Sequence, residues 1–104
     1  MHVQNKISAV IITGNEENNI KDCLKSVHWA DEIIVVDSYS ADKTVAIANT
    51  FEKVKTYQNK FIDFSSQRNF AIDCARNPWI LFIDADERLT PELKSEIIET
   101  VQKP

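Results

Sequence analysis

The chain has 104 residues, of which 43% are hydrophobic and 27% are charged, and its 12 basic and 16 acidic residues leave a formal net charge of -4. This length allows one compact domain with a hydrophobic core but not two, and the acidic balance argues against a nucleic-acid-binding protein, which needs a concentrated positive surface. With one Gly, three Pro and no low-complexity run, the chain is predicted to be ordered nearly throughout.

The sequence carries no targeting signal and no cysteine motif. No apolar run approaches the roughly 20 residues that cross a bilayer, and the first six residues lack the layout of a signal peptide. We therefore expect a soluble, cytoplasmic chain, either free or peripheral to the inner face of the membrane. Cys23 and Cys74 have neither a CxxC partner nor a His at metal-ligand spacing, so both are predicted to be buried thiols.

The first half of the chain predicts strand, helix and strand. The apolar runs Ile7 to Ile12 and Ile33 to Val36 barely alternate with polar residues, as expected for strands buried on both faces. Asn15, ahead of Glu16 and Glu17, is predicted to cap the intervening helix. The apolar stripe of that helix has the spacing i, i+3, i+4, i+7: Ile20, Cys23, Leu24 and Val27.

The middle of the chain continues the alternation. Ser40, ahead of Asp42, predicts the start of a second helix. That helix repeats the apolar spacing at Thr44, Ile47, Ala48 and Phe51. A weaker strand, Val54 to Tyr57, is predicted to lie nearer a sheet edge, and a third helix is predicted from about Ser65 to Ala75.

The last elements are a strongly apolar strand and a final helix. The run Trp79 to Ile83 is predicted to be buried on both faces, and Thr90, Pro91 and Glu92 open the helix that follows. Four strands thus alternate with four helices, and right-handed crossovers make the predicted sheet mostly parallel. We expect an α/β fold in one domain over residues 1–104, which stops directly after its last helix, as a truncated protein would.

Polar residues follow the predicted strands at their carboxyl ends. They are Thr13, Gly14, Asn15 and Glu16 after the first strand, Asp37 after the second, and Asp84, Asp86 and Glu87 after the last. Because the carboxyl ends of parallel strands open on one edge of the sheet, we expect at least three carboxylates to face one crevice. Their mutual repulsion predicts a compensating divalent cation.

The pair Asp84 and Asp86 is the best candidate for holding that cation. Two residues apart, they would lie on the same side of an extended segment and present hard oxygen ligands to Mg²⁺ or Mn²⁺ shared with substrate phosphates. The alternative is that both are solvated loop acids ahead of a helix. Equally, Asp37 alone is explained by a turn, and Arg68 by an exposed helix face.

Four motifs occur in one order along the chain: Ile7–Thr13 with Asn15–Glu17, Glu32–Ser38 with Ser40–Thr44, Gln67–Asn69, and Phe82–Arg88. In this order they resemble the family-two inverting glycosyltransferases over nearly the whole chain, which implies the Rossmann-like nucleotide-binding half of a GT-A fold. The segments Asp37–Ser40, Ser66–Ala71 and Asp84–Leu89 look most like those of bacterial lipopolysaccharide-core β-glucosyltransferases.

The resemblance implies a nucleotide-sugar donor, with UDP as the nucleotide. Thr13, Asn15 and Glu16 would border the nucleotide, Asp37 would accept a hydrogen bond from the uracil ring, and Arg68 would lie along the pocket. Two positions depart from the family pattern. Gly14 replaces a bulkier residue in the pocket wall, and Tyr39 replaces a Gly in a turn where a positive φ suits Tyr poorly.

The resemblance also implies the reaction. Asp84 would approach the ribose, and Asp86 would carry the Mg²⁺ or Mn²⁺ that bridges the diphosphate. An acceptor hydroxyl of a glycan or lipid-linked molecule would attack the anomeric carbon with inversion, in cell-envelope synthesis. The family's catalytic base comes from a segment beyond the Asp-x-Asp strand, and we expect it beyond Pro104.

Three other functions are alternatives for such a sequence. A Mg²⁺-dependent phosphotransferase also places Asp-x-Asp after a parallel strand, but no Thr or Lys constellation follows the pair here. A dinucleotide-dependent oxidoreductase is disfavoured because a single Gly cannot supply a G-x-G-x-x-G turn. A nucleotide-binding module without turnover stays open as a description of this chain.

Overall fold

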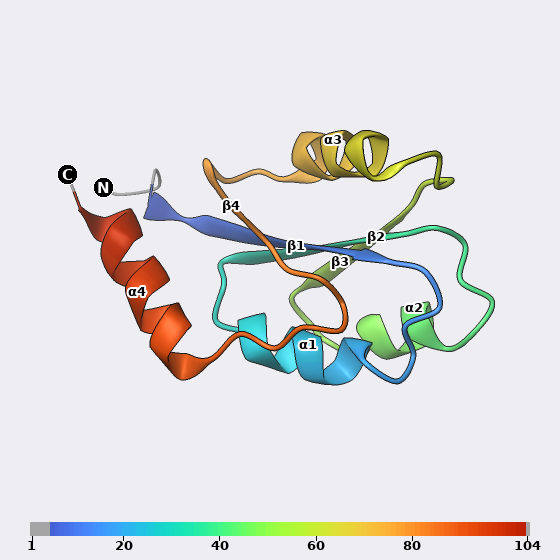
Figure 1. Cartoon of the computed structure of the whole chain (residues 1–104), viewed down its shortest axis with the longest axis horizontal. Helices are drawn as coiled ribbons and strands as arrows, with labels where there is room; N and C mark the ends of the chain where they lie inside the picture. The colour runs from blue at the N-terminus through green and yellow to red at the C-terminus, as the bar shows by residue number, and fades with distance from the viewer. Residues whose placement is uncertain (1–4, 104) are drawn as a thin grey trace.

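The structure is a computed structural model that describes residues 5–103, and its four strands alternate with four helices as predicted (Figure 1). The elements are β1 (Ile7–Thr13), α1 (Ile20–Val27), β2 (Glu32–Asp37), α2 (Thr44–Ala48), β3 (Val54–Gln58), α3 (Phe64–Cys74), β4 (Trp79–Phe82) and α4 (Pro91–Gln102). The strands form one sheet in the order β3-β2-β1-β4, and every neighbouring pair is parallel. The predicted α/β class with a mostly parallel sheet is confirmed.

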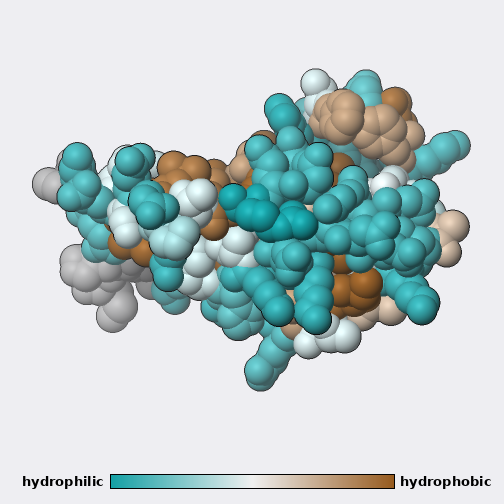
Figure 2. Space-filling model, turned by 60° about the horizontal axis from the view of Figure 1, so that its bottom comes forward, coloured by the Kyte–Doolittle hydropathy of each residue, from teal (hydrophilic) through white to brown (hydrophobic). Residues whose placement is uncertain are grey.

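Helices cover both faces of the two central strands. Residues Ala9, Ile11, Ile33 and Val35 pack against α1 and α2 on one face, while Val10, Ile34 and Val36 pack against α3 on the other (Figure 1). The prediction that β1 and β2 are buried on both faces is therefore confirmed. Each fully buried Val or Ile side chain contributes roughly 1.5–3 kcal/mol to folding. The outer surface of the α1–α2 layer is mostly hydrophilic (Figure 2).

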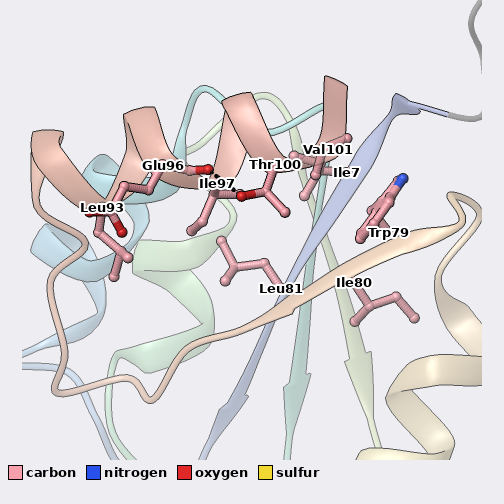
Figure 3. A pocket seen from close by; sticks show the side chains of 9 residues that line it. All are labelled: Ile7, Trp79, Ile80, Leu81, Leu93, Glu96, Ile97, Thr100 and Val101. Atoms are coloured by element: carbon pink, nitrogen blue, oxygen red, sulfur yellow. Dashed lines mark hydrogen bonds between the residues drawn. The ribbon is translucent and has the colours of Figure 1, made fainter. Parts of the chain in front are cut away.

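The two edge strands differ in how well the sequence predicted them. β3 lies at one edge, as expected. β4 lies at the other, so the prediction that Trp79–Ile83 is buried on both faces is wrong: Trp79 is 42% and Phe82 38% exposed. An apolar cavity of 290 Å³ separates β4 from α4, lined by residues such as Leu81 and Ile97 (Figure 3). The apolar run indicated a strand but carried no information on its place in the sheet.

The helix starts follow local signals at only some of the predicted positions. Thr90 accepts a hydrogen bond from the Leu93 N–H, and Pro91 follows at the first helical position, so the predicted start of α4 is confirmed. The predicted caps Asn15 and Ser40 are wrong, because α1 begins at Ile20 and α2 at Thr44. Both residues bond elsewhere, as described below.

The two cysteines differ in burial. Cys23 is fully buried as predicted, and desolvation raises the pKa of its thiol to about 12. Cys74 is only half-buried, because it ends α3 beside the loop that leads to β4.

No helix within residues 5–103 has both the length and the apolar character needed to cross a bilayer.

Candidate functional site

The carboxylate of Asp37, at the end of β2, is fully buried and receives four hydrogen bonds from the chain. Oδ1 accepts from Thr13 Oγ1 at 2.7 Å and from Ser40 Oγ at 2.6 Å. Oδ2 accepts from the Ser40 N–H at 2.8 Å and from Gln58 Nε2 at 2.9 Å. A carboxylate offers about four lone-pair sites, so these donors occupy all of them. Asp37 thereby joins the ends of β1, β2 and β3.

These contacts decide the protonation state of Asp37. Desolvation by burial raises the pKa of this carboxyl, but the hydrogen bonds from Ser40, Thr13 and Gln58 favour the charged form more strongly, and the net pKa lies below its ordinary value. Asp37 is therefore ionised at neutral pH. A ligand can bond to it only by displacing one of the four donors, and Gln58 is the exposed one.

The loop after β1 is hydrogen-bonded to the loop after β2 along its length. The Asn15 N–H donates to Ser40 Oγ at 2.7 Å, and Asn15 Oδ1 accepts from the Ala41 N–H at 2.9 Å. One residue further, the Glu16 N–H donates to Thr44 Oγ1 at 2.8 Å. The side chains predicted to cap helices instead connect these two loops, which we call the loop frame (residues 13–17 and 37–44).

The loop frame contains both positive-φ residues found within residues 5–103, Asn15 at 56° and Tyr39 at 54°. Asn tolerates this region because its short polar side chain can bond locally. Tyr does not, and the conformation costs roughly 1 kcal/mol or more. The turn after Asp37 therefore retains a positive φ despite the Tyr.

The other departure from the family pattern, Gly14, has a steric reason. A Cβ atom added at this position would lie 3.0 Å from Ser38 Oγ, which is closer than ordinary contact. The Ser38 hydroxyl in turn donates to the Thr13 carbonyl at 3.1 Å. The absence of a side chain at residue 14 thus lets the two loops approach.

The predicted metal ligands lie in a turn rather than in an extended segment. The Glu87 N–H donates to the Asp84 carbonyl at 2.9 Å, and Glu87 Oε1 accepts from the Asp84 N–H at 2.8 Å. The expected extended segment is not formed because β4 ends at Phe82, before Asp84. Ala85 is buried beneath the turn, whereas Asp84 and Asp86 are exposed.

The charge distribution at this edge differs from the predicted one. Within the described residues 5–103, no group of three or more Asp, Glu, His or Cys side chains could hold a metal ion, so the expected crevice of at least three carboxylates is wrong. Asp37 is buried within the loop frame, and the Glu87 carboxylate accepts a hydrogen bond from the Asp84 N–H in the same turn. Asp84 and Asp86 remain exposed, and carboxylate oxygens are ligands of the kind that Mg²⁺ and Mn²⁺ accept.

Arg68, from α3, faces the same small cavity as Asp84. This cavity, at the carboxyl end of β4, has a volume of 60 Å³. The Arg68 guanidinium stands over the Phe82 ring, 5.7 Å from its centre, a distance within the range of cation–π attraction. The structure thus brings Arg68 and Asp84 together from segments that are distant in the sequence.

Several residues that shape the site were not among the predicted ones. Gln58 completes the shell around Asp37, and Gln67 is fully buried, where Nε2 donates to the Asn59 carbonyl at 3.0 Å. Gln58 ends β3 at the same sheet edge, so the rule that selected Asp37 would also have selected it. Gln67 belongs to the motif Gln67–Asn69, but the sequence did not indicate its burial, because it stands in a mostly polar helix.

The parallel sheet with helices on both faces has the fold of the GT-A glycosyltransferases. Residues 8–104 match Glycosyl transferase family 2, and the chain belongs to that family. It is 48% identical over 88% of its length to an uncharacterized glycosyltransferase of Rickettsia bellii, covering 31% of that protein. It is 43% identical over 92% of its length to the glycosyltransferase SunS of Bacillus subtilis, covering 24% of it. The chain thus spans about a third or less of these relatives.

Solved structures share the fold. Mannosyl-3-phosphoglycerate synthase from Rubrobacter xylanophilus matches with a TM-score of 0.79 at 22% identity, over 95% of this chain and 37% of that one. Glucosyl-3-phosphoglycerate synthase from Mycobacterium tuberculosis was solved with Mn²⁺, UDP and glucosyl-3-phosphoglycerate. It matches with a TM-score of 0.70 at 21% identity, over 80% of this chain and 35% of that one. The predicted family and its GT-A fold are confirmed, while the likeness to lipopolysaccharide-core enzymes stays a prediction.

Proposed function

We propose that this chain forms the donor-binding part of an inverting glycosyltransferase and that its donor is a UDP-sugar. The observation that carries the proposal is the loop frame: two loops joined by hydrogen bonds end at the same sheet edge as the exposed Asp84–Asp86 turn. The family membership supports a nucleotide-sugar donor. The complex of the mycobacterial relative in fold with UDP and Mn²⁺ supports uridine as the base.

The nucleotide would lie along the loop frame. Thr13, Asn15 and Glu16 would border it, with their backbone already fixed by the second loop. A uracil N–H would bond to Asp37 by replacing the exposed amide of Gln58, because the other three donors are held in the frame. Asp37 would then fix the base while still joining the ends of β1 and β2.

The diphosphate and ribose would lie at the turn after β4. Asp84 would approach the ribose, with Arg68 beside it along the pocket. Asp86 would hold Mg²⁺ or Mn²⁺ through a carboxylate oxygen, with the diphosphate supplying further ligands. When bound, the cation would neutralise the charge that grows on the departing diphosphate.

The acceptor would be a glycan or lipid-linked alcohol of the cell envelope, reached at the cytoplasmic side of the membrane, with lipopolysaccharide core as the first candidate. Its hydroxyl would attack the anomeric carbon opposite the leaving diphosphate, which inverts the configuration. We assign the catalytic base to none of the residues at this edge. Glu87, a further carboxylate in the same turn, accepts a hydrogen bond from the Asp84 N–H.

A calorimetric competition between UDP and ADP, with Mn²⁺ present, tests the donor. A pocket that pairs with the edge of one base leaves polar groups unpaired when another base enters, so we expect UDP to bind at least ten-fold more tightly. Equal affinity for the two nucleotides would overturn the assignment of uridine. No affinity for either would overturn donor binding.

A further inference from the structure

Tyr39 combines backbone strain with exposure at the loop frame. Its φ is 54°, and 67% of its surface is exposed. Neither the ring pairs nor the cation–ring contacts found within residues 5–103 include it. A ring in water adds little to the hydrophobic core, and Gly would adopt this backbone without strain. Folding therefore gives no reason for a Tyr here.

The backbone around Tyr39 is held on both sides. Its own N–H donates to Gln58 Oε1 at 2.8 Å. Before it, the Ser38 N–H donates to the Thr13 carbonyl at 3.0 Å, and after it Ser40 donates both its N–H and its hydroxyl to the carboxylate that ends β2. The bonds of Ser38 and Ser40 do not involve Gln58, so they hold the turn even when the Gln58 amide is displaced by a base. The ring thus extends from a turn that is held before any ligand arrives, which lowers the entropy lost on binding.

We propose that the Tyr39 ring is the platform on which the planar base of the nucleotide stacks; this rests on the donor-binding function proposed above. Strained residues collect at ligand sites, where the surrounding structure holds them in place. Both positive-φ residues found within the described part of the chain, Asn15 and Tyr39, lie in the loop frame, and Tyr39 is the one that this conformation strains. An aromatic ring binds a base through its face. Tyr39 therefore supplies affinity for any base, while the choice of uracil depends on Asp37.

Calorimetry on three forms of the whole chain tests this proposal, with two probes in the presence of Mn²⁺: UDP and inorganic pyrophosphate. Tyr39→Gly removes the ring, and Tyr39→Phe keeps it. Loss of one stacked base corresponds to about ten-fold weaker binding, or about 1.4 kcal/mol. We expect Tyr39→Gly to weaken UDP by about that factor and to leave pyrophosphate unchanged. Tyr39→Phe should bind UDP within about two-fold of the unchanged chain.

The melting temperature separates stacking from a structural role of the ring. Because Gly relieves the strained φ, Tyr39→Gly should melt at the same temperature as the unchanged chain or higher while it loses UDP affinity. UDP affinity unchanged by Tyr39→Gly would overturn the stacking role alone. Equal weakening of UDP and pyrophosphate would also overturn it, because a loop defect then explains the loss. If the unchanged chain binds neither probe, the donor-binding function fails together with this inference.

Discussion

At the scale of single residues, Asp37 connects folding with the candidate site. It is buried, charged and bonded by four donors. The sequence indicated its place at the carboxyl end of a strand, but not its burial. Two of its four donors, Thr13 and Gln58, stand on other strands, while Ser40 supplies the other two from three residues away. The contacts from Thr13 and Gln58 depend on strand order, which local patterns do not encode.

We predict that Asp37→Asn destabilises the fold by about 1.5–3 kcal/mol, because an amide NH₂ would face donors that now bond to a carboxylate. The effect should depend on pH. The pKa of Asp37 is lowered in the folded state, so as pH falls the unfolded state binds a proton first and stability decreases. The advantage of the unchanged chain over the variant is then complete above about pH 5 and shrinks below about pH 4.

Urea unfolding at several pH values between 3 and 7 measures this difference. The carboxyls of Glu32, Asp42 and Asp63 also have lowered pKa values, but they are common to both proteins and cancel in the comparison. A free-energy difference that stays constant across the whole range would show that ionisation of Asp37 does not contribute to stability.

A second prediction concerns Asp86, which is exposed on the turn after β4. Asp86→Asn should remove most of the gain in UDP affinity that Mn²⁺ provides, because the amide no longer offers a charged oxygen ligand. The melting temperature should stay the same, since surface changes usually alter stability by less than about 0.5 kcal/mol. Glu99→Gln, an exposed change of the same kind on α4, is the matched control. Persistence of the Mn²⁺ effect in Asp86→Asn would remove the metal assignment.

At the scale of elements, apolar runs located the four strands, periodicity located α1 and α2, the alternation of strand and helix located α3, and the start signal at Thr90 located α4. Local signals did not fix the limits or neighbours of these elements. Asn15 and Ser40 have the chemistry of helix caps, yet Asn15 bonds to residues 25 and 26 positions away. The apolar run of β4 has the composition of a central strand although it lies at a sheet edge. The composition of a strand indicates how buried such strands are on average. The place of a strand in the sheet depends instead on which strands pair with it.

The helix α4 provides a prediction at this scale. Only Val101 of this helix is buried, and a cavity separates it from β4 (Figure 3). Removing its cap with Thr90→Ala costs about 1 kcal/mol of helix stability, and we expect that loss to stay local. Amide hydrogen exchange should rise in residues 91–102 and stay unchanged in β1 and β2.

Thr100→Ala is the control for this experiment, because it removes a hydroxyl from the same helix without touching the cap and replaces Thr with a better helix former. It should slow exchange in α4 or leave it unchanged. Faster exchange throughout the sheet in Thr90→Ala would mean that α4 unfolds together with the core.

At the scale of the whole molecule, the order of strands and helices was sufficient to predict the parallel sheet, and this sheet positions the site. Thr13 and Asp37 stand in register at the ends of β1 and β2, and β4 lies on the other side of β1. The ends of three strands therefore meet at one edge. The sequence did not indicate that, at this edge, the carboxylate of Asp37 is buried while those of Asp84 and Asp86 are exposed.

The measurement that tests this account most directly is paramagnetic broadening of backbone amide signals by Mn²⁺ in the isotope-labelled chain, in the presence of UDP. The account predicts that the signals of residues 84–87 broaden first, followed by those of the loop frame, while residues 93–101 beside the apolar cavity keep their intensity. Broadening centred on any other part of the chain, or spread evenly over it, would contradict a metal-assisted nucleotide site at the carboxyl edge of the sheet.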